Sequence, residues 1–131
     1  MLDKQSLVEA WLLKAEHDLG TARIIYQHLP EYYDTICFHC QQAVEKYLKA
    51  LLVHLNVEFR PLHQLTYLLD LLSEKIEVSD DWYQSAIVLE NYSVEIRYPE
   101  TIITLSDDDV SEAIQIAEKF QYIASERIIS C

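Results

Sequence analysis

The sequence predicts an all-α fold, an antiparallel up-and-down bundle of four to five helices. Hydrophobic residues make up 50% of the 131 residues and are spread along the whole chain, which is enough to build one core. Helix breakers are few, with one glycine and three prolines, and each proline falls between periodic segments. No segment has the pattern of a strand, and no repeat or flexible linker divides the chain. We therefore expect one soluble domain over residues 1–131.

Apolar residues that recur every three or four positions place the helices. Ser6 with Glu9, and Ser106 with Asp109, have the spacing of an N-terminal capping box. Ser79 precedes two aspartates at a further helix start. The expected helices cover residues 4–28, 33–56, 63–75, 80–96 and 107–128.

The first expected helix carries one apolar stripe, which we expect to face the core. Gly20 lies off this stripe and costs the helix up to about 1 kcal/mol relative to alanine. The stripe consists of Val8, Trp11, Ala15, Leu19, Ala22 and Tyr26.

The second expected helix places Cys37 and Cys40 on an apolar face, which predicts that both cysteines are core residues. A redox or metal pair is the alternative, but a thioredoxin-like motif should follow a strand and a zinc site needs a second pair. With Cys131 the cysteines are odd in number, which is typical of free thiols rather than a disulfide framework. The other residues of this face are Val44, Leu48, Leu51 and Leu55.

Two polar side chains interrupt that apolar face. Gln41 projects into it and Glu45 lies at its edge, whereas Gln42, Lys46 and Lys49 are expected on the opposite, solvent-like side. Buried polar groups cost free energy unless they are hydrogen-bonded. Gln41 and Glu45 should therefore have partners within the bundle, across a dimer or in a ligand.

Cationic residues gather between the second and third expected helices, where they could frame an anion site. Lys46, Lys49, Arg60 and His63 form this group. The alternative is that the lysines are solvated charges and that His63 caps or packs at its helix start. The sequence leaves both interpretations open.

Arg97 is a separate candidate at the end of the fourth expected helix. Pro99 disfavours helical geometry for Tyr98, which leaves the Arg97 guanidinium at a helix terminus. There it can bind a phosphate or pair with a carboxylate such as Glu45 or Glu95. The sequence does not separate these two roles.

The charge balance limits the possible partners. Ten Lys and Arg against 22 Asp and Glu give a net charge of -12, which repels nucleic acid and anionic lipid at a distance. No apolar run approaches the ~20 residues that span a bilayer, and no signal peptide is evident, so we expect a cytoplasmic protein without membrane contact. No cofactor or metal is expected, because the chain has a single glycine and no Glu-x-x-His pair. The remaining histidines, 17, 28, 39 and 54, are interpreted as surface or boundary residues.

Four segments together resemble the small bacterial and archaeal HEPN domains. They are Trp11-x-x-x-Ala15-x-x-Asp18-Leu19-x-x-Ala22, the string Cys37-Phe38-His39-Cys40-Gln41-Gln42-Ala43-Val44-Glu45-Lys46-Tyr47-Leu48-Lys49-Ala50-Leu51, His63-x-Leu65, and Arg97-Tyr98-Pro99. The resemblance implies a helical bundle that usually forms a homodimer. It also implies frequent pairing with a small nucleotidyltransferase in a toxin-antitoxin-like system.

Many HEPN proteins are metal-independent ribonucleases that use an arginine followed a few residues later by a histidine. Here no histidine occurs after Arg97, so the cleavage motif is absent. We therefore favour a non-catalytic module that binds a nucleotide or a nucleotidyltransferase partner. The alternatives are a ribonuclease toxin that uses Arg97 with His63 on RNA, and a scaffolding dimer without a small ligand. The candidate ligand-binding residues are Gln41, Glu45, Lys46, Lys49, His63 and Arg97.

Overall fold

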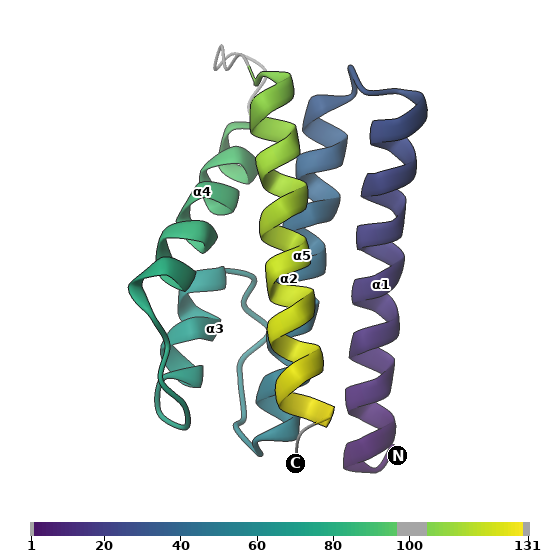
Figure 1. The fold of residues 1–131 in the computed structure, drawn as a ribbon. Helices are drawn as coiled ribbons and strands as arrows, with labels where there is room; N and C mark the ends of the chain where they lie inside the picture. The colour runs from purple at the N-terminus through teal and green to yellow at the C-terminus, as the bar shows by residue number, and fades with distance from the viewer. Residues whose placement is uncertain (1, 97–104, 130–131) are drawn as a thin grey trace.

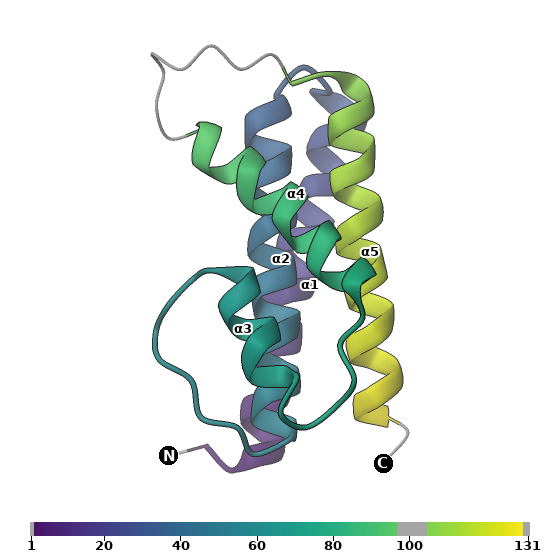
Figure 2. The ribbon, with the colours of Figure 1, turned by 90° about the vertical axis from the view of Figure 1, so that its left-hand side faces the viewer.

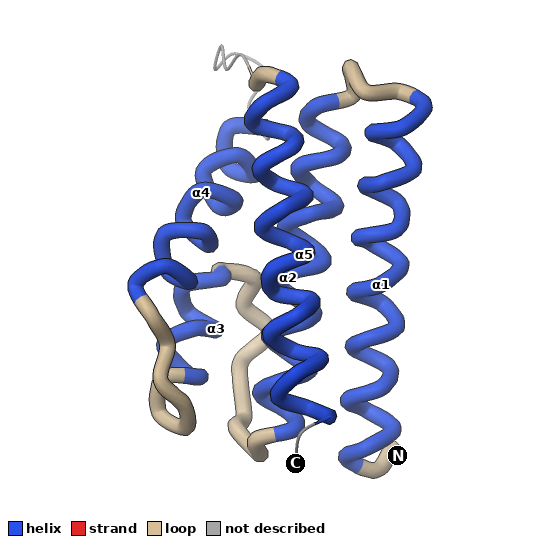
Figure 3. The backbone as a smooth tube through the Cα atoms, viewed as in Figure 1, coloured by secondary structure: helices blue, strands red, loops and turns tan. Residues whose placement is uncertain are grey.

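The computed structural model describes residues 2–96 and 105–129, and the side chains of residues 93–96 are not described. Within this part of the chain every regular element is helical (Figure 3). The prediction of an all-α fold with five helices is confirmed. The helices are α1 (Lys4–His28), α2 (Tyr33–His54), α3 (Leu65–Leu72), α4 (Asp80–Ile96) and α5 (Asp107–Ile129).

The helices form an up-and-down bundle around α2. Helices α1 and α2 lie side by side in opposite directions, and α5 runs beside them in the direction of α2 (Figure 1). The short α3 and the tilted α4 cover another side of α2 (Figure 2). Helix α2 packs against each of the other four helices. It is therefore the centre of the fold.

This central position changes which residues of α2 are buried. Thirteen of its 22 residues are buried, including Gln41, Glu45 and Lys49. Cys37 and Cys40 lie in the core, as predicted. The expectation that Lys49 points to a solvent-like side is wrong, because neighbouring elements cover almost the whole circumference of α2.

The apolar stripe of α1 faces α2 as predicted. Val8, Ala15, Leu19 and Ala22 are fully buried or nearly so. The two aromatic members of the stripe, Trp11 and Tyr26, are half-buried at its edges. Gly20 lies off the stripe, and a Cβ atom added to it would meet no other atom within 4 Å. The core therefore does not require a glycine at this position.

The helix starts are capped by side chains, but not always by the expected ones. At α5 the Asp109 N–H donates to Ser106 Oγ (3.2 Å) and the Ser106 N–H donates to Asp109 Oδ2 (2.9 Å), so that capping box is confirmed. The bond from the Ser106 N–H is the largest cause that holds the pKa of Asp109 below its usual value, with smaller contributions from the side chains of Ser106 and Tyr92. At α1 the expected box of Ser6 and Glu9 is wrong. Asp3 is the cap, and it accepts from the Ser6 N–H at 2.8 Å.

The connection between α2 and α3 is longer than predicted. Helix α2 ends at His54, and α3 covers only Leu65–Leu72 instead of residues 63–75. Asn56 has a positive φ of 61°, which turns the chain away from the helix axis. His63 consequently lies in this connection and not in a helix. No helix in the described ranges is long and apolar enough to cross a membrane.

Candidate functional site

Four polar residues gather where the α2–α3 connection passes α2. We call Gln41, Glu45, Lys49 and His63 the Glu45 cluster. The Glu45 side chain is only 4% exposed, and its Oε2 accepts from Lys49 Nζ at 2.9 Å. The same Oε2 lies 3.0 Å from His63 Nδ1. One buried carboxylate oxygen therefore holds both a lysine and a histidine.

Gln41 joins the same cluster to the backbone of the connection. Its Nε2 lies 3.5 Å from the carbonyl oxygen of His63, at the long limit of a hydrogen bond. Its Oε1 accepts from Gln42 Nε2 at 3.0 Å. The prediction that Gln41 and Glu45 turn inward is confirmed, and both find partners inside the molecule.

Lys49 is buried between two aromatic rings. Its Nζ lies 5.3 Å from the centre of the Trp11 ring and 5.7 Å from that of Phe59. An ammonium group over ring faces gains cation–π attraction, which is larger where water is excluded. Lys49 thus fastens α1 and the α2–α3 connection to α2 while it neutralises Glu45.

The second oxygen of the Glu45 carboxylate has no partner among the described residues. Oε1 is buried and accepts no hydrogen bond from the residues that the structure describes. Leaving such an acceptor unpaired costs about 1–3 kcal/mol, and more when it is charged. The Glu45 cluster therefore has the capacity to accept one further donor.

His63 presents its ring to solvent. The side chain is 68% exposed although Nδ1 faces the Glu45 carboxylate. An ionised carboxylate only accepts, so Nδ1 carries the proton of this contact. In the neutral imidazole the other nitrogen, Nε2, is then an accessible hydrogen-bond acceptor.

A second polar cluster joins α1 and α2, and of its residues only Lys46 was among the predicted site residues. Asp18 on α1 accepts from Lys46 through Oδ2, and its Oδ1 lies 3.0 Å from His39 Nδ1. We call Asp18, His39 and Lys46 the Asp18 cluster. His39 and Lys46 are seven positions apart and share a face of α2, which is the signal that could have indicated a common partner.

The structure separates the two predicted lysines. Lys46 and Lys49 belong to different clusters, and each is held by a carboxylate. Arg60 lies in the α2–α3 connection, where its backbone N–H donates to the hydroxyl of Tyr67 at 3.0 Å. Arg97 lies outside the described residues, so its expected approach to Glu45 stays a prediction.

The cysteines lack the environment of a reactive pair. Burial, with smaller contributions from Asp109 and Asp34, raises the pKa of Cys37 to about 12. Burial also raises the pKa of Cys40 well above its usual value. Thiolates are the reactive and metal-binding form, so neither residue provides one near neutral pH. This agrees with their interpretation as core residues.

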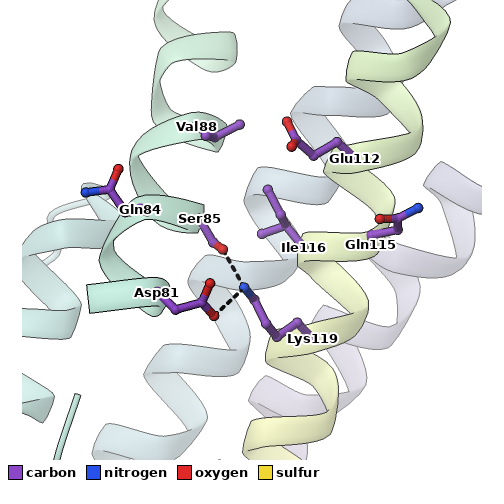
Figure 4. A pocket seen from close by; sticks show the side chains of 8 residues that line it. All are labelled: Asp81, Gln84, Ser85, Val88, Glu112, Gln115, Ile116 and Lys119. Atoms are coloured by element: carbon purple, nitrogen blue, oxygen red, sulfur yellow. Dashed lines mark hydrogen bonds and ion pairs between the residues drawn. The ribbon is translucent and has the colours of Figure 1, made fainter. Parts of the chain in front are cut away.

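A groove of about 420 Å³ lies between α4 and α5 (Figure 4). Lys119 Nζ donates to Asp81 at 2.8 Å and to Ser85 Oγ at 2.5 Å. A serine beside a lysine is one form of activated nucleophile, in which the amine accepts the hydroxyl proton. Here Lys119 Nζ donates to both neighbours, so the contact is not that of a base that accepts the Ser85 proton. We interpret the contact as a bridge between α4 and α5.

Comparison with known proteins decides the family. Residues 8–127 match the model of the HEPN domain. The chain belongs to the HEPN family. No match was found among the curated proteins.

Solved structures of similar proteins share the fold. The chain is 29% identical to an archaeal HEPN homologue, with 92% of this chain and 97% of that chain covered and a TM-score of 0.75. A protein of Thermus thermophilus is 30% identical, with 91% and 96% covered and a TM-score of 0.76. A HEPN domain protein of Thermotoga maritima is 22% identical, with 96% and 99% covered and a TM-score of 0.73, and supports the fold alone.

Proposed function

We propose that this HEPN protein is a non-catalytic subunit that binds a small nucleotidyltransferase, with which it forms a toxin-antitoxin-like pair. The supporting observation is the unpaired Oε1 of buried Glu45 beside the exposed imidazole of His63. Together they offer acceptors that the described residues of the chain do not use. A partner's backbone or side-chain donor can reach the exposed imidazole of His63, whereas Oε1 of Glu45 is closed to solvent in the described structure.

The surface around His63 has the composition of a protein interface. Phe38 lies one helical turn before Gln41 and Gln42, and Leu62 directly precedes His63. Both Phe38 and Leu62 are exposed large hydrophobic residues. We propose that Phe38 and Gln42 of α2 and Leu62 and His63 of the α2–α3 connection form one face, which we call the α2 open face. Aromatic and aliphatic side chains with little net charge are typical of interface centres.

The charges near this face argue against an RNA-binding surface. Both lysines next to it are neutralised, Lys46 by Asp18 and Lys49 by Glu45. RNA and phosphate binding depend on uncompensated positive charge, and the whole chain carries -12. The face therefore suits a protein partner better than a phosphate-rich ligand.

A binding measurement with the product of a neighbouring nucleotidyltransferase gene tests the proposal. We expect a stable complex by size-exclusion chromatography with light scattering. Phe38→Glu should weaken it at least about tenfold, because it places a charge in the interface. Tyr122→Glu is the matched control, since Tyr122 is an exposed aromatic residue on α5. Equal loss in both variants, or no complex at all, contradicts the proposal.

Two further measurements separate the alternatives. A nucleotide at 100 times its dissociation constant should raise stability by about 2.7 kcal/mol, so a thermal shift with nucleotides alone indicates a nucleotide site instead. RNA cleavage by a clean preparation that is lost in Arg97→Ala indicates a ribonuclease. Either result overturns the partner-binding proposal.

A further inference from the structure

The carboxylate of Glu45 has more acceptor capacity than its described partners use. Its Oε2 accepts from Lys49 Nζ at 2.9 Å and lies 3.0 Å from Nδ1 of His63. Its Oε1 accepts from none of the residues that the structure describes. An ionised carboxylate has about four positions for donors, two on each oxygen. Lys49 and His63 occupy the positions of one oxygen, so a ligand that brings a second N–H group would find the other oxygen unused.

His63 is the partner of Glu45 that can be exchanged. Its side chain is 68% exposed, whereas that of Lys49 is 6% exposed and is held between two aromatic rings. Residues 60–64, which carry His63, are all exposed. The contact that ties this stretch to Gln41 is 3.5 Å long, the limit of a hydrogen bond. The imidazole can therefore turn into solvent while Lys49 stays on the carboxylate.

A guanidinium group has the geometry that the unused oxygen requires. Its planar fork donates two parallel N–H bonds to the two oxygens of one carboxylate. In the place of the imidazole, one N–H would bind Oε2 beside Lys49 and the other would bind Oε1. The exchange gives up one hydrogen bond of Glu45 and forms two. A lysine ammonium is a compact point charge without this fork, so arginine is the better ligand.

The charge of the chain favours an approaching cation. The 131 residues carry a net charge of -12, which attracts a positively charged surface at a distance. Within the cluster Lys49 is paired with Glu45, so its charge repels an incoming guanidinium only weakly. A guanidinium is also more weakly hydrated than an ammonium, which lowers the cost of entering a partly buried site. These properties suit an arginine on the surface of a protein partner.

We propose that the Glu45 cluster binds a guanidinium group, which an arginine of the protein partner supplies and which takes the place of the His63 imidazole. The inference rests on the proposed function for the source of the arginine. His63 then covers Glu45 only in the free chain, and turning it outward opens Oε1 to the partner. Arginine is enriched at the centres of protein interfaces, and the α2 open face, which includes His63, adjoins this position.

Titration with a small arginine ligand tests the guanidinium site. The probe is N-acetyl-arginine methylamide, and N-acetyl-lysine methylamide is its matched control because it carries the same charge. Proton–nitrogen correlation NMR of the isotope-labelled chain follows the backbone amides of Gln41 and His63. We expect saturable shifts with the arginine probe, and binding of the lysine probe that is at least about threefold weaker. Equal binding of the two probes overturns the proposal.

A set of variants assigns the binding to Glu45, with circular dichroism as the check that each is folded. His63→Ala removes the competing imidazole, so the arginine probe should bind about threefold more tightly or better. Glu45→Gln/Lys49→Met replaces the buried pair by neutral side chains of similar size, which should keep the fold and weaken binding at least about tenfold. Asp18→Asn removes the carboxylate of the other cluster and should leave binding unchanged. Weaker binding in His63→Ala, or unchanged binding in the double variant, contradicts the exchange.

Two further measurements separate the source of the guanidinium from the proposed function. Arg97→Ala should not change the affinity for the arginine probe. A gain in affinity would show that the chain's own arginine occupies Glu45, which overturns the assignment to a partner. Glu45→Gln/Lys49→Met should weaken the complex with the nucleotidyltransferase at least about tenfold. A complex of unchanged affinity in this variant leaves the proposed function standing and refutes the arginine contact, whereas absence of any complex, with probe binding retained, refutes the proposed function alone.

Discussion

The Glu45 cluster and the Asp18 cluster contain the same chemistry arranged in two ways. Each contains one carboxylate, one lysine of α2 and one histidine bound through Nδ1, and the Glu45 cluster also contains Gln41. Asp18 uses one oxygen for each donor, whereas Glu45 places both donors on Oε2 and leaves Oε1 unpaired. Within the described residues the Asp18 cluster is thus complete, and the Glu45 cluster has one acceptor unused. We infer binding only from the second.

Burial sharpens the same contrast. The side chains of Glu45 and Lys49 are 4% and 6% exposed, whereas those of Asp18 and Lys46 are 14% and 22% exposed. Water can therefore screen the Asp18 pair in part but hardly reaches the Glu45 pair. Breaking a buried ion pair leaves an uncompensated charge, which is more costly than breaking a screened one.

The largest effect is expected from Lys49→Met. The substitution keeps much of the side-chain volume between Trp11 and Phe59 but leaves Glu45 buried without its cation. We expect a loss of about 3–5 kcal/mol in the free energy of unfolding, measured by urea denaturation. Adding Glu45→Gln should restore part of the loss. A cost below that of an exposed-lysine substitution would show that the pair is not buried in solution.

A smaller loss is expected from Asp18→Asn in the other cluster. The amide can still accept one hydrogen bond, and both Lys46 and His39 can reach water. We expect about 1–2 kcal/mol by the same urea measurement. If this loss equals that of Lys49→Met, the two clusters do not differ as their burial indicates.

The opposite, apolar side of α2 gives a reference for complete burial. The pKa of Cys37 is raised from 9.0 to about 12, so the folded state keeps the thiol proton at pH values where the unfolded state loses it. The contribution of Cys37 to the free energy of unfolding is therefore fully present below pH 9. It decreases between pH 9 and 12 by about 1 kcal/mol per pH unit. Urea midpoints from pH 8 to 11 check the slope, with Cys37→Ala as the control that should reduce it by the contribution of this thiol, while Cys40, whose pKa is also raised by burial, keeps part of it. A slope that is unchanged by Cys37→Ala contradicts the burial.

The smallest effect is expected from His63→Ala. The side chain is 68% exposed and its partner Glu45 keeps Lys49, so the free energy of unfolding should change by no more than about 0.5 kcal/mol. His39→Ala should cost more, because His39 is partly buried against Asp18. If His63→Ala lowers the free energy of unfolding more than His39→Ala does, His63 has a structural role, and the basis for its binding role is removed.

The helices could be predicted because their signals are local. The spacing of apolar residues predicts the five helical segments. The cap of α5 is predicted by two residues that lie three positions apart, Ser106 and Asp109. At α1 the same rule selected Ser6, although Asp3 stands at the position where the first free N–H groups point. A capping rule alone does not choose between two acceptors one turn apart.

The site residues were predicted less well because their partners are distant in the chain. The inward orientation of Gln41 and Glu45 follows from helix periodicity. The burial of Lys49 does not, because it depends on Phe59 and on Trp11 of another helix. Asp18 is 28 positions from Lys46, so no local pattern joins them. The placement of Arg97 relative to Glu45 stays a prediction.

The packing of Lys49 between the rings of Trp11 and Phe59 restricts how the α2–α3 connection can move. The α2–α3 connection cannot swing away from the bundle without pulling Phe59 off the ammonium group and drawing His63 from Glu45 in the same step. Opening of this loop and release of the imidazole are therefore coupled. Phe59→Ala removes the ring from Lys49. Hydrogen exchange of the backbone amides in residues 57–64 should then accelerate together, as one unit.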